Sequence, residues 1–198
     1  MKGFNFFKRK AHKEINRFDE PSVNSDLIYR EVADEKPVYD SDTTLLSVLD
    51  YIRDNSAALG VYLNKPANDL EIESFENQKG KLPHDFKLLY RFSNGFETDH
   101  DLFRFIPLEE ISKNEMDKSF LICDNSFHFC EYMIYSDIWS VEINNENINE
   151  YRIYNKAENV VFLTNSLAEF LCVFFKEGIY DGLYGWRESI EKSVNKIL

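Results

Sequence analysis

The fold is decided by residues 63–97, which read LNKPANDLEIESFENQKGKLPHDFKLLYRFSNGFE. Asn68 and Glu71 stand three residues apart, as the two members of a capping box do, ahead of a run with apolar residues at helical spacing. They predict a helix that starts at this pair and ends near Gly80. This segment therefore begins with a helix whose start is marked chemically.

The second half of the stretch predicts a shorter helix. Pro83 suits a first-turn position, because the missing N–H of proline has no partner to lose there. Asn94 and Gly95 tolerate the left-handed backbone that commonly closes a helix. A helix of about two turns is expected between these two signals.

A further helix is expected on the N-terminal side. Apolar residues recur there at helical spacing behind polar residues that are able to cap a helix. The apolar positions are Leu45, Val48, Leu49 and Ile52, and the polar ones are Ser41, Asp42 and Thr43. Residues 1–40 show no sustained period. We therefore predict a flexible, basic-to-polar arm at residues 1–40 and a single folded domain at residues 41–198.

Strand patterns dominate after Gly95, and these runs are too closely spaced for crossover helices. The expected strands are 102–106, 120–123, 127–135, 138–143, 151–154 and 160–163. Ser166 and Glu169 then form a capping-box pattern ahead of a helix that Gly178 ends, and a last helix follows. The order predicts an α+β fold, with N-terminal helices, an antiparallel meander of about five to six strands and C-terminal helices.

The charge of the chain is negative and unevenly distributed. The formal net charge is −12, but residues 1–18 carry +5, so the remainder carries −17. A body this acidic repels nucleic acid and attracts basic partners. No apolar run approaches the roughly 20 residues of a membrane span, and the apolar run at the N-terminus is too short for a secretory signal. We expect a cytoplasmic protein, with contact between the basic start and anionic lipid as the less favoured alternative.

The usual signatures of catalysis and cofactor binding are missing from the sequence. It holds no P-loop, no dinucleotide fingerprint, no nucleophile elbow and no zincin or zinc-deaminase motif. Cys123, Cys130 and Cys172 are widely spaced and include no CxxC pair. We therefore expect no enzymatic activity and no cofactor.

Two small groups of polar residues remain as alternatives. His128 and Cys130 alternate on one expected strand and could form half of a metal site, but structural zinc needs four ligands and no second pair is visible. The run Asp99-His100-Asp101 follows the expected Asn-Gly cap, where adjacent loop residues more often face water than form a catalytic cluster. We expect neither group to bind a metal.

The stretch 63–97 also resembles the signature of the SUKH superfamily, which includes the yeast cell-wall assembly regulator. The shared features are a Pro-Ala before a helix with an acidic residue, then Leu-Pro, a short aromatic and aliphatic helix, and Asn-Gly. The matching positions are Pro66-Ala67, Glu76, Leu82-Pro83, Phe86, Leu89-Tyr90 and Asn94-Gly95. Residues 106–111, IPLEEI, are similar to a later strand and turn of the family, and residues 166–171 are similar to its C-terminal helix.

The resemblance spans about residues 43–178, and it implies the function as well as the fold. Bacterial members of this superfamily are mostly immunity proteins that bind and neutralise toxins, which are commonly nucleases or deaminases with basic sites. We therefore expect a non-catalytic immunity protein whose partner is a cognate toxin with a basic surface. The alternative that the resemblance leaves open is a regulatory or scaffold module of the yeast type.

An acidic surface is the expected contact with this partner. If Trp139, Val141 and Ile143 point inward, strand alternation turns Ser140 and Glu142 outward. On the neighbouring strand, inward Tyr151 and Ile153 leave Glu150, Arg152 and Tyr154 outward, and the loop after Gly95 is a candidate neighbour. The predicted partner-binding residues are Glu97, Asp99, Asp101, Glu142, Glu150 and Tyr154.

Overall fold

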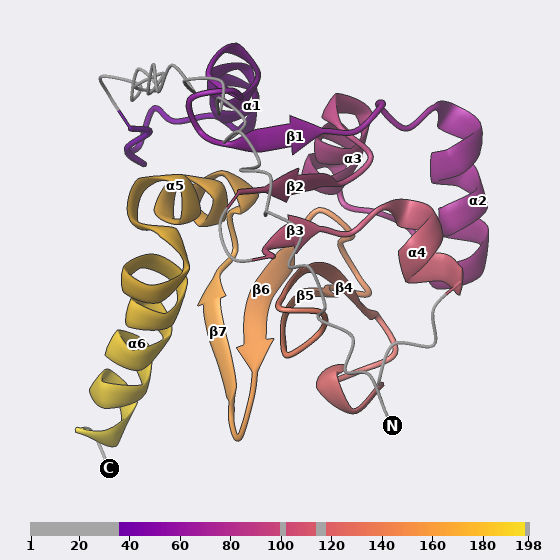
Figure 1. Ribbon diagram of the computed structural model, residues 1–198. Helices are drawn as coiled ribbons and strands as arrows, with labels where there is room; N and C mark the ends of the chain where they lie inside the picture. The colour runs from indigo at the N-terminus through magenta and orange to yellow at the C-terminus, as the bar shows by residue number, and fades with distance from the viewer. Residues whose placement is uncertain (1–35, 100–101, 114–117, 197–198) are drawn as a thin grey trace, which may run out of the picture.

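Seven antiparallel strands form the centre of the molecule, as the computed structural model in Figure 1 shows. The structure describes residues 36–99, 102–113 and 118–196. The strands lie side by side in chain order, so that each one pairs with the next. Their bounds are β1 Val61–Leu63, β2 Phe96–Thr98, β3 Arg104–Phe105, β4 Ser126–Tyr132, β5 Asp137–Ile143, β6 Tyr151–Lys156 and β7 Val160–Thr164.

The predicted α+β class and antiparallel meander are confirmed, but the number of strands is seven rather than five to six. Strands β1 and β2 have three residues each, which is too short for an alternating pattern to be visible in the sequence. The expected strand at 120–123 is wrong. Residues 118–120 form a 3₁₀ helix, and the N–H of Ile122 donates to the hydroxyl of Tyr154 instead of to a neighbouring strand.

The helices begin close to where the sequence predicts. They are α1 Leu45–Asp54, α2 Asp69–Lys79, α3 His84–Phe92, α4 Leu108–Lys113, α5 Leu167–Glu177 and α6 Gly185–Asn195, with a π-helical segment at Gly178–Tyr184 between the last two. The capping box of Asn68 and Glu71 is formed in both directions. Helix α1 is capped by Thr44, whose side chain accepts the N–H of Ser47. This cap lies one residue after Thr43, the last of the three capping candidates in the sequence.

Aromatic rings join the helices to one face of the sheet, which we call the inner face. Phe86 of α3 makes edge-to-face contacts with Phe127, Phe129 and Tyr151 of β4 and β6. Phe170 of α5 contacts Phe129 in the same geometry. Such ring pairs contribute beyond the apolar area they bury, so they fix how α3 and α5 lie across the sheet.

Glu76 stabilises the connection between α2 and α3. Its carboxylate accepts the backbone N–H of Leu82 at 3.0 Å and pairs with Lys81 at 2.8 Å and Lys87 at 2.7 Å. The side chain is only 7 % exposed. Burial by itself disfavours the charged form, but the hydrogen bonds from Lys81, Lys87 and Leu82 outweigh it and lower the pKa of Glu76.

The Asn-Gly turn after α3 fastens the start of β2 to the chain that follows β3. Helix α3 ends at Ser93, and Gly95 adopts φ +75°, as the left-handed prediction requires. A Cβ atom on Gly95 would lie 2.5 Å from the carbonyl oxygen of Phe105, so a larger residue does not fit. Asn94 Oδ1 accepts the N–H of Leu108 at the start of α4.

The predicted arm at residues 1–40 lies mostly outside the described residues. Within the described part, residues 36–40 contact the folded body, since Lys36 Nζ donates to the carbonyl oxygen of Lys176 at the end of α5. Asp40 accepts hydrogen bonds from Thr43 and Asp42 ahead of α1. The chain therefore makes ordered contacts a few residues before the expected boundary at Ser41.

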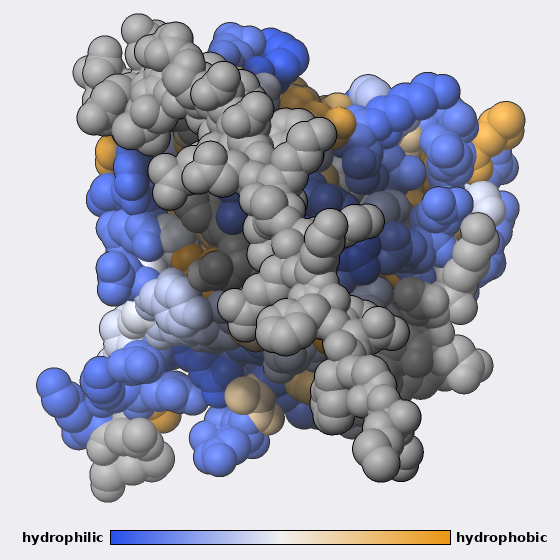
Figure 2. All heavy atoms as spheres, viewed as in Figure 1, coloured by the Kyte–Doolittle hydropathy of each residue, from blue (hydrophilic) through white to orange (hydrophobic). Residues whose placement is uncertain are grey.

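Hydrophilic residues cover most of the described surface on the side seen in Figure 2, including the outer side of α2. Among the described residues, no helix is long and apolar enough to cross a membrane.

The first prediction concerns the aromatic layer. Replacement of Phe170 by Ala removes a fully buried ring from the contact between α5 and the sheet. The expected loss is about 3–5 kcal/mol in the free energy of unfolding, measured by chemical denaturation. Leu70→Ala is the control, because Leu70 is 76 % exposed and its loss is expected to change stability by less than about 0.5 kcal/mol. Equal effects of the two changes would show that this layer does not hold the fold.

The second prediction concerns the pH dependence of stability. The pKa of Glu76 is lower in the folded protein than its ordinary value of 4.5, so its ionisation stabilises the fold above that pH, and this contribution is lost as the pH falls through the folded pKa. Glu76→Gln should destabilise the protein by about 1–3 kcal/mol at pH 7. The difference from wild type should shrink in acid, where wild type also loses the charge. A difference that stays constant from pH 7 to pH 3 would contradict this role.

Candidate functional site

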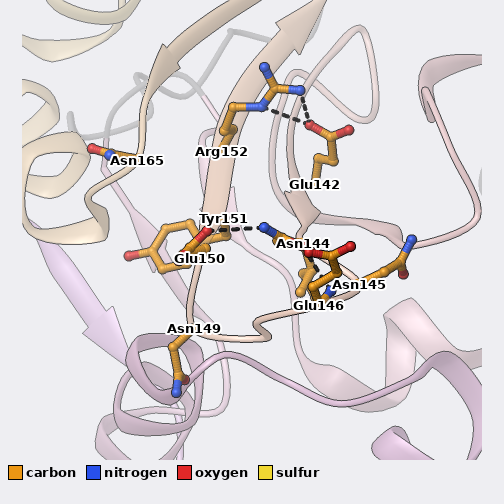
Figure 3. Close-up of a pocket in the computed structure, with 10 residues that line it drawn as sticks. Glu142, Asn144, Asn145, Glu146, Asn149, Glu150, Tyr151, Arg152 and Asn165 are labelled. Atoms are coloured by element: carbon orange, nitrogen blue, oxygen red, sulfur yellow. Dashed lines mark hydrogen bonds and ion pairs between the residues drawn. The ribbon is translucent and has the colours of Figure 1, made fainter.

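A surface pocket of about 700 Å³ opens at the loop that joins β5 to β6 (Figure 3). It lies at the end of the two strands where the sequence predicts outward carboxylates. Its lining is polar and rich in amides and carboxylates. The lining residues are Glu142, Ile143, Asn144, Asn145, Glu146, Asn149, Glu150, Tyr151, Arg152 and Asn165. Glutamates outnumber the single arginine among them, so the pocket favours cationic or hydrogen-bond-donating ligand groups.

Glu142 and Arg152 form one wall of the pocket. They face each other across the β5–β6 pair, and Arg152 Nη2 lies 2.5 Å from Glu142 Oε2. The guanidinium of Arg152 also stacks 3.8 Å from the ring centre of Phe162 on β7. Glu142 is therefore outward, as predicted, but an internal cation already neutralises much of its charge.

Glu150 shapes the loop itself. Its two carboxylate oxygens accept the side-chain amides of Asn144 and Asn147, at 3.0 and 2.9 Å. The N–H of Asn144 in turn bonds the carbonyl oxygen of Glu150, which closes the loop at its base. Glu150 is exposed, as predicted, and most of its accepting capacity serves to hold the loop in shape.

Glu146 is the pocket carboxylate that the sequence argument did not single out. It stands at the tip of the loop and is exposed, and its own N–H donates to Asn144 Oδ1 in an Asx turn. Within the part of the chain that the structure describes, no ion pair of the Glu146 carboxylate is seen. Residues 144–147 are rich in asparagine, which is typical of a loop, but such a composition does not say which side chain faces the pocket.

Tyr151 anchors the floor of the pocket to two helices. Its hydroxyl donates to Asp85 Oδ2 of α3 at 2.5 Å and accepts the N–H of Leu167 at the start of α5 at 2.9 Å. Burial, followed by the hydrogen bond to Asp85, raises the pKa of the Tyr151 hydroxyl well above its ordinary value. The hydroxyl therefore stays protonated and keeps donating at neutral pH. Nearby, Asn149 Oδ1 accepts the N–H of His84 and ties the loop to α3.

Tyr154 does not reach the surface, which corrects the prediction. It points to the outer face of β6 as strand alternation requires, but it is 0 % exposed. The segment after the 3₁₀ helix covers it, and Ile122 N–H donates to its hydroxyl. Ser140, also expected outward, is buried beside it and bonds the ring of His128 at 2.6 Å. Local alternation gave the correct face, and a distant segment decided the exposure.

The other predicted acidic group lies at the opposite end of the sheet. Glu97 and Asp99 are exposed at the end of β2, which pairs with β3 near the turn between β4 and β5. Strand β5 has seven residues, so this end is about 20 Å from the pocket. The suggested neighbourhood with Glu142 and Glu150 is therefore wrong. Asp101, with His100, lies outside the described residues.

His128 and Cys130, which the sequence left as an alternative pair of metal ligands, point to different faces of the sheet. A bulge in β4 falls between them, so that Cys130 pairs with Trp139 in the core while His128 meets Ser140 on the outer face. Their side chains do not converge on one ion. Within the described residues, no group of three potential metal ligands was found.

The fold and the pocket define an α+β protein that presents an acidic, amide-lined pocket at one end of an antiparallel sheet. Comparison with protein-family models finds no matching family, and comparison with curated proteins finds no matching sequence.

The third prediction tests the anchoring of the pocket. Tyr151→Phe keeps the ring in the core but leaves Asp85 and the N–H of Leu167 without the hydroxyl. We expect a loss of about 1–3 kcal/mol in the free energy of unfolding, because both groups are left without their partner. Faster hydrogen exchange at the Leu167 amide should accompany it. Unchanged exchange at that amide would show that the hydroxyl does not hold the start of α5.

Proposed function

We propose that this chain is a non-catalytic immunity protein, which binds a cognate bacterial toxin in the cytoplasm and neutralises it. The observation that carries the proposal is the acidic pocket at the β5–β6 loop, together with the charge of −17 on the chain after residue 18. A toxin that acts on nucleic acid needs a basic surface, and an acidic protein is attracted to it over distance.

The construction of the pocket supports binding rather than chemistry. Most of its side chains are carboxylates and amides, Glu150 bonds the amide of Asn144, and its floor is tied to α3 and α5 through Tyr151. A preorganised surface of this kind lowers the cost of ordering side chains when a partner binds. Lysine or arginine side chains are suitable ligands, because they only donate hydrogen bonds and the exposed carboxylate of Glu146 supplies acceptors.

The resemblance of residues 63–97 to the SUKH signature supports the same function. Three of the motif positions have a structural task in this chain: Glu76 holds the α2–α3 connection, and Asn94 and Gly95 fasten β2 to the start of α4. These residues build a scaffold and leave the loops of the sheet to vary. A family that meets many different toxins needs this division between constant scaffold and variable surface.

The fourth prediction uses Glu146. The full chain and the toxin domain encoded beside it should co-purify, and the chain should rescue growth of cells that express that domain. Glu146→Lys should slow association severalfold at low salt, and the difference should shrink at high salt, because screening weakens interactions between exposed charges. Glu146 is a cleaner choice than Glu142 or Glu150, whose carboxylates hold Arg152 and the loop.

Glu73→Lys is the matched control, since Glu73 is an exposed glutamate on α2 that does not line the pocket. It changes the net charge equally, so a similar effect of both variants would assign the attraction to overall charge and not to the pocket. If wild type neither binds the toxin domain nor rescues growth, the immunity function is wrong. Binding without rescue would favour the regulatory or scaffold module instead.

A further inference from the structure

The end of the sheet opposite the pocket carries an unusual concentration of left-handed backbone. Within the described residues, the non-glycine positions with positive φ are Leu102, Met133, Ile134 and Tyr135, at 63°, 50°, 53° and 63°. Leu102 lies in the β2–β3 connection, and the other three form the turn between β4 and β5. Arg104 of β3 pairs with Glu131 of β4, so both connections lie at the same end of the sheet.

Three of these four residues are also exposed apolar side chains. Ile134 is 76 % exposed, Leu102 is 63 % exposed and Met133 is 48 % exposed. Tyr180, which is 61 % exposed, reaches the same end of β4, because its hydroxyl lies 2.6 Å from that of Tyr132, the residue before Met133. We call Leu102, Met133 and Ile134 the apolar turn surface.

The stability of the fold explains neither the positive φ angles of these residues nor the exposure of their apolar side chains. A β-branched residue such as Ile134 rarely adopts positive φ, and glycine or asparagine satisfies a tight turn with less strain. An exposed isoleucine also gains little from burial within the chain. A polar turn residue would fold better at these positions than a strained, exposed apolar one. The apolar residues in the turn therefore indicate a role in binding a partner.

A partly buried ion-pair network around Glu131 and Arg104 holds the turn in place. Glu131, which is 2 % exposed, accepts the N–H of Tyr135 at 2.6 Å and pairs with Arg104. Arg104 also binds Glu110 of α4 at 2.8 Å and donates to the hydroxyl of Tyr135 at 3.1 Å. The turn is therefore fixed from both sides before any partner arrives. Such preorganisation is what a binding anchor requires.

The charges around the apolar turn surface indicate the partner. On β2 to β5 at this end of the sheet, carboxylates outnumber the guanidinium of Arg104. The exposed acidic residues are Glu97 and Asp99, and Asp137 is half-buried, whereas Glu131 and Glu110 are paired with Arg104. We infer that the apolar turn surface is a second docking site of this chain, which inserts Met133 and Ile134 into an apolar pocket rimmed by basic groups on a protein partner. The part of a second copy after residue 18 does not supply that rim, because it carries a net charge of −17.

The partner that fits is the basic toxin domain, so the inference rests on the proposed function. The pocket and the apolar turn surface would then hold different parts of one partner, or of the same partner in successive contacts. Apolar anchors in desolvated pockets dominate binding energy at protein interfaces, whereas exposed charges act mainly on association. The apolar turn surface is therefore expected to govern the dissociation rate.

The fifth prediction compares two equally exposed apolar residues. Ile134→Asn places a residue that tolerates positive φ in the turn, and Leu70→Asn removes a side chain with the same 76 % exposure from α2. We expect Ile134→Asn to melt at the same temperature as wild type or a few degrees higher, and to dissociate from the toxin domain at least about tenfold faster. Leu70→Asn should bind as wild type does. Kinetics on immobilised toxin domain and thermal unfolding supply both measurements.

The outcomes separate this inference from the proposed function. If wild type binds and Ile134→Asn dissociates at the same rate, the docking site is wrong while the immunity function stands. If wild type does not bind the toxin domain, the immunity function is wrong, and so is the toxin domain as the partner of the apolar turn surface. A marked fall in melting temperature for Ile134→Asn would overturn the inference, because the turn would then be structural. Self-association of the free chain in sedimentation, lost in Ile134→Asn, would also overturn it in favour of a second copy.

Discussion

The structure depends on a layer of aromatic rings that joins α3 and α5 to one face of the sheet. Phe86 meets three rings of β4 and β6, and Phe170 meets Phe105 and Phe129 on the neighbouring strands. Rings have few preferred contact geometries, so this layer fixes the position of both helices and the register of the strands beneath them. The remaining elements attach to this centre.

The outer face and the two ends of the sheet lie outside this aromatic layer, so their side chains differ in burial and in polarity. Where the segment after residue 118 crosses the outer face, Tyr154 and Ser140 are buried. Where nothing in the described chain crosses it, Arg152 remains exposed at the β5–β6 end. The register that the inner face imposes thus places an acidic pocket at one end and strained apolar turns at the other, about 20 Å apart.

These two ends suit different parts of a binding process. The pocket is polar and acidic, and its exposed carboxylates act over distance on a basic partner. The β4–β5 turn is apolar and strained, and it is supported by the ion pair between buried Glu131 and half-buried Arg104, which are properties of a short-range anchor. Stability lost to strain in Met133 and Ile134 is compatible with selection for binding, since proteins tolerate local costs at functional sites.

The sequence by itself determined the class of fold, the positions of α2 and α3, and the inner faces of the long strands. These features follow from local chemistry: a capping box at Asn68, a glycine at residue 95 that must turn left-handed, and alternation around Trp139. It also identified Glu142 and Glu150 as surface carboxylates, because alternation and turn composition are local.

Only the tertiary structure decided which segments cover these residues, which charges pair with them and which residues lie beside them. Tyr154 is buried by a segment more than 30 positions away in the chain, and Glu142 is neutralised by a partner on the next strand. Glu97 and Asp99 were separated from the pocket by strand order, which no local pattern encodes. The positive φ of Ile134 lay inside what the sequence indicated as strand, because a run of apolar residues looks the same whether it continues a sheet or turns away from it. Exposure, pairing and proximity are relations between distant parts of the chain, and they exist only once the sheet has assembled.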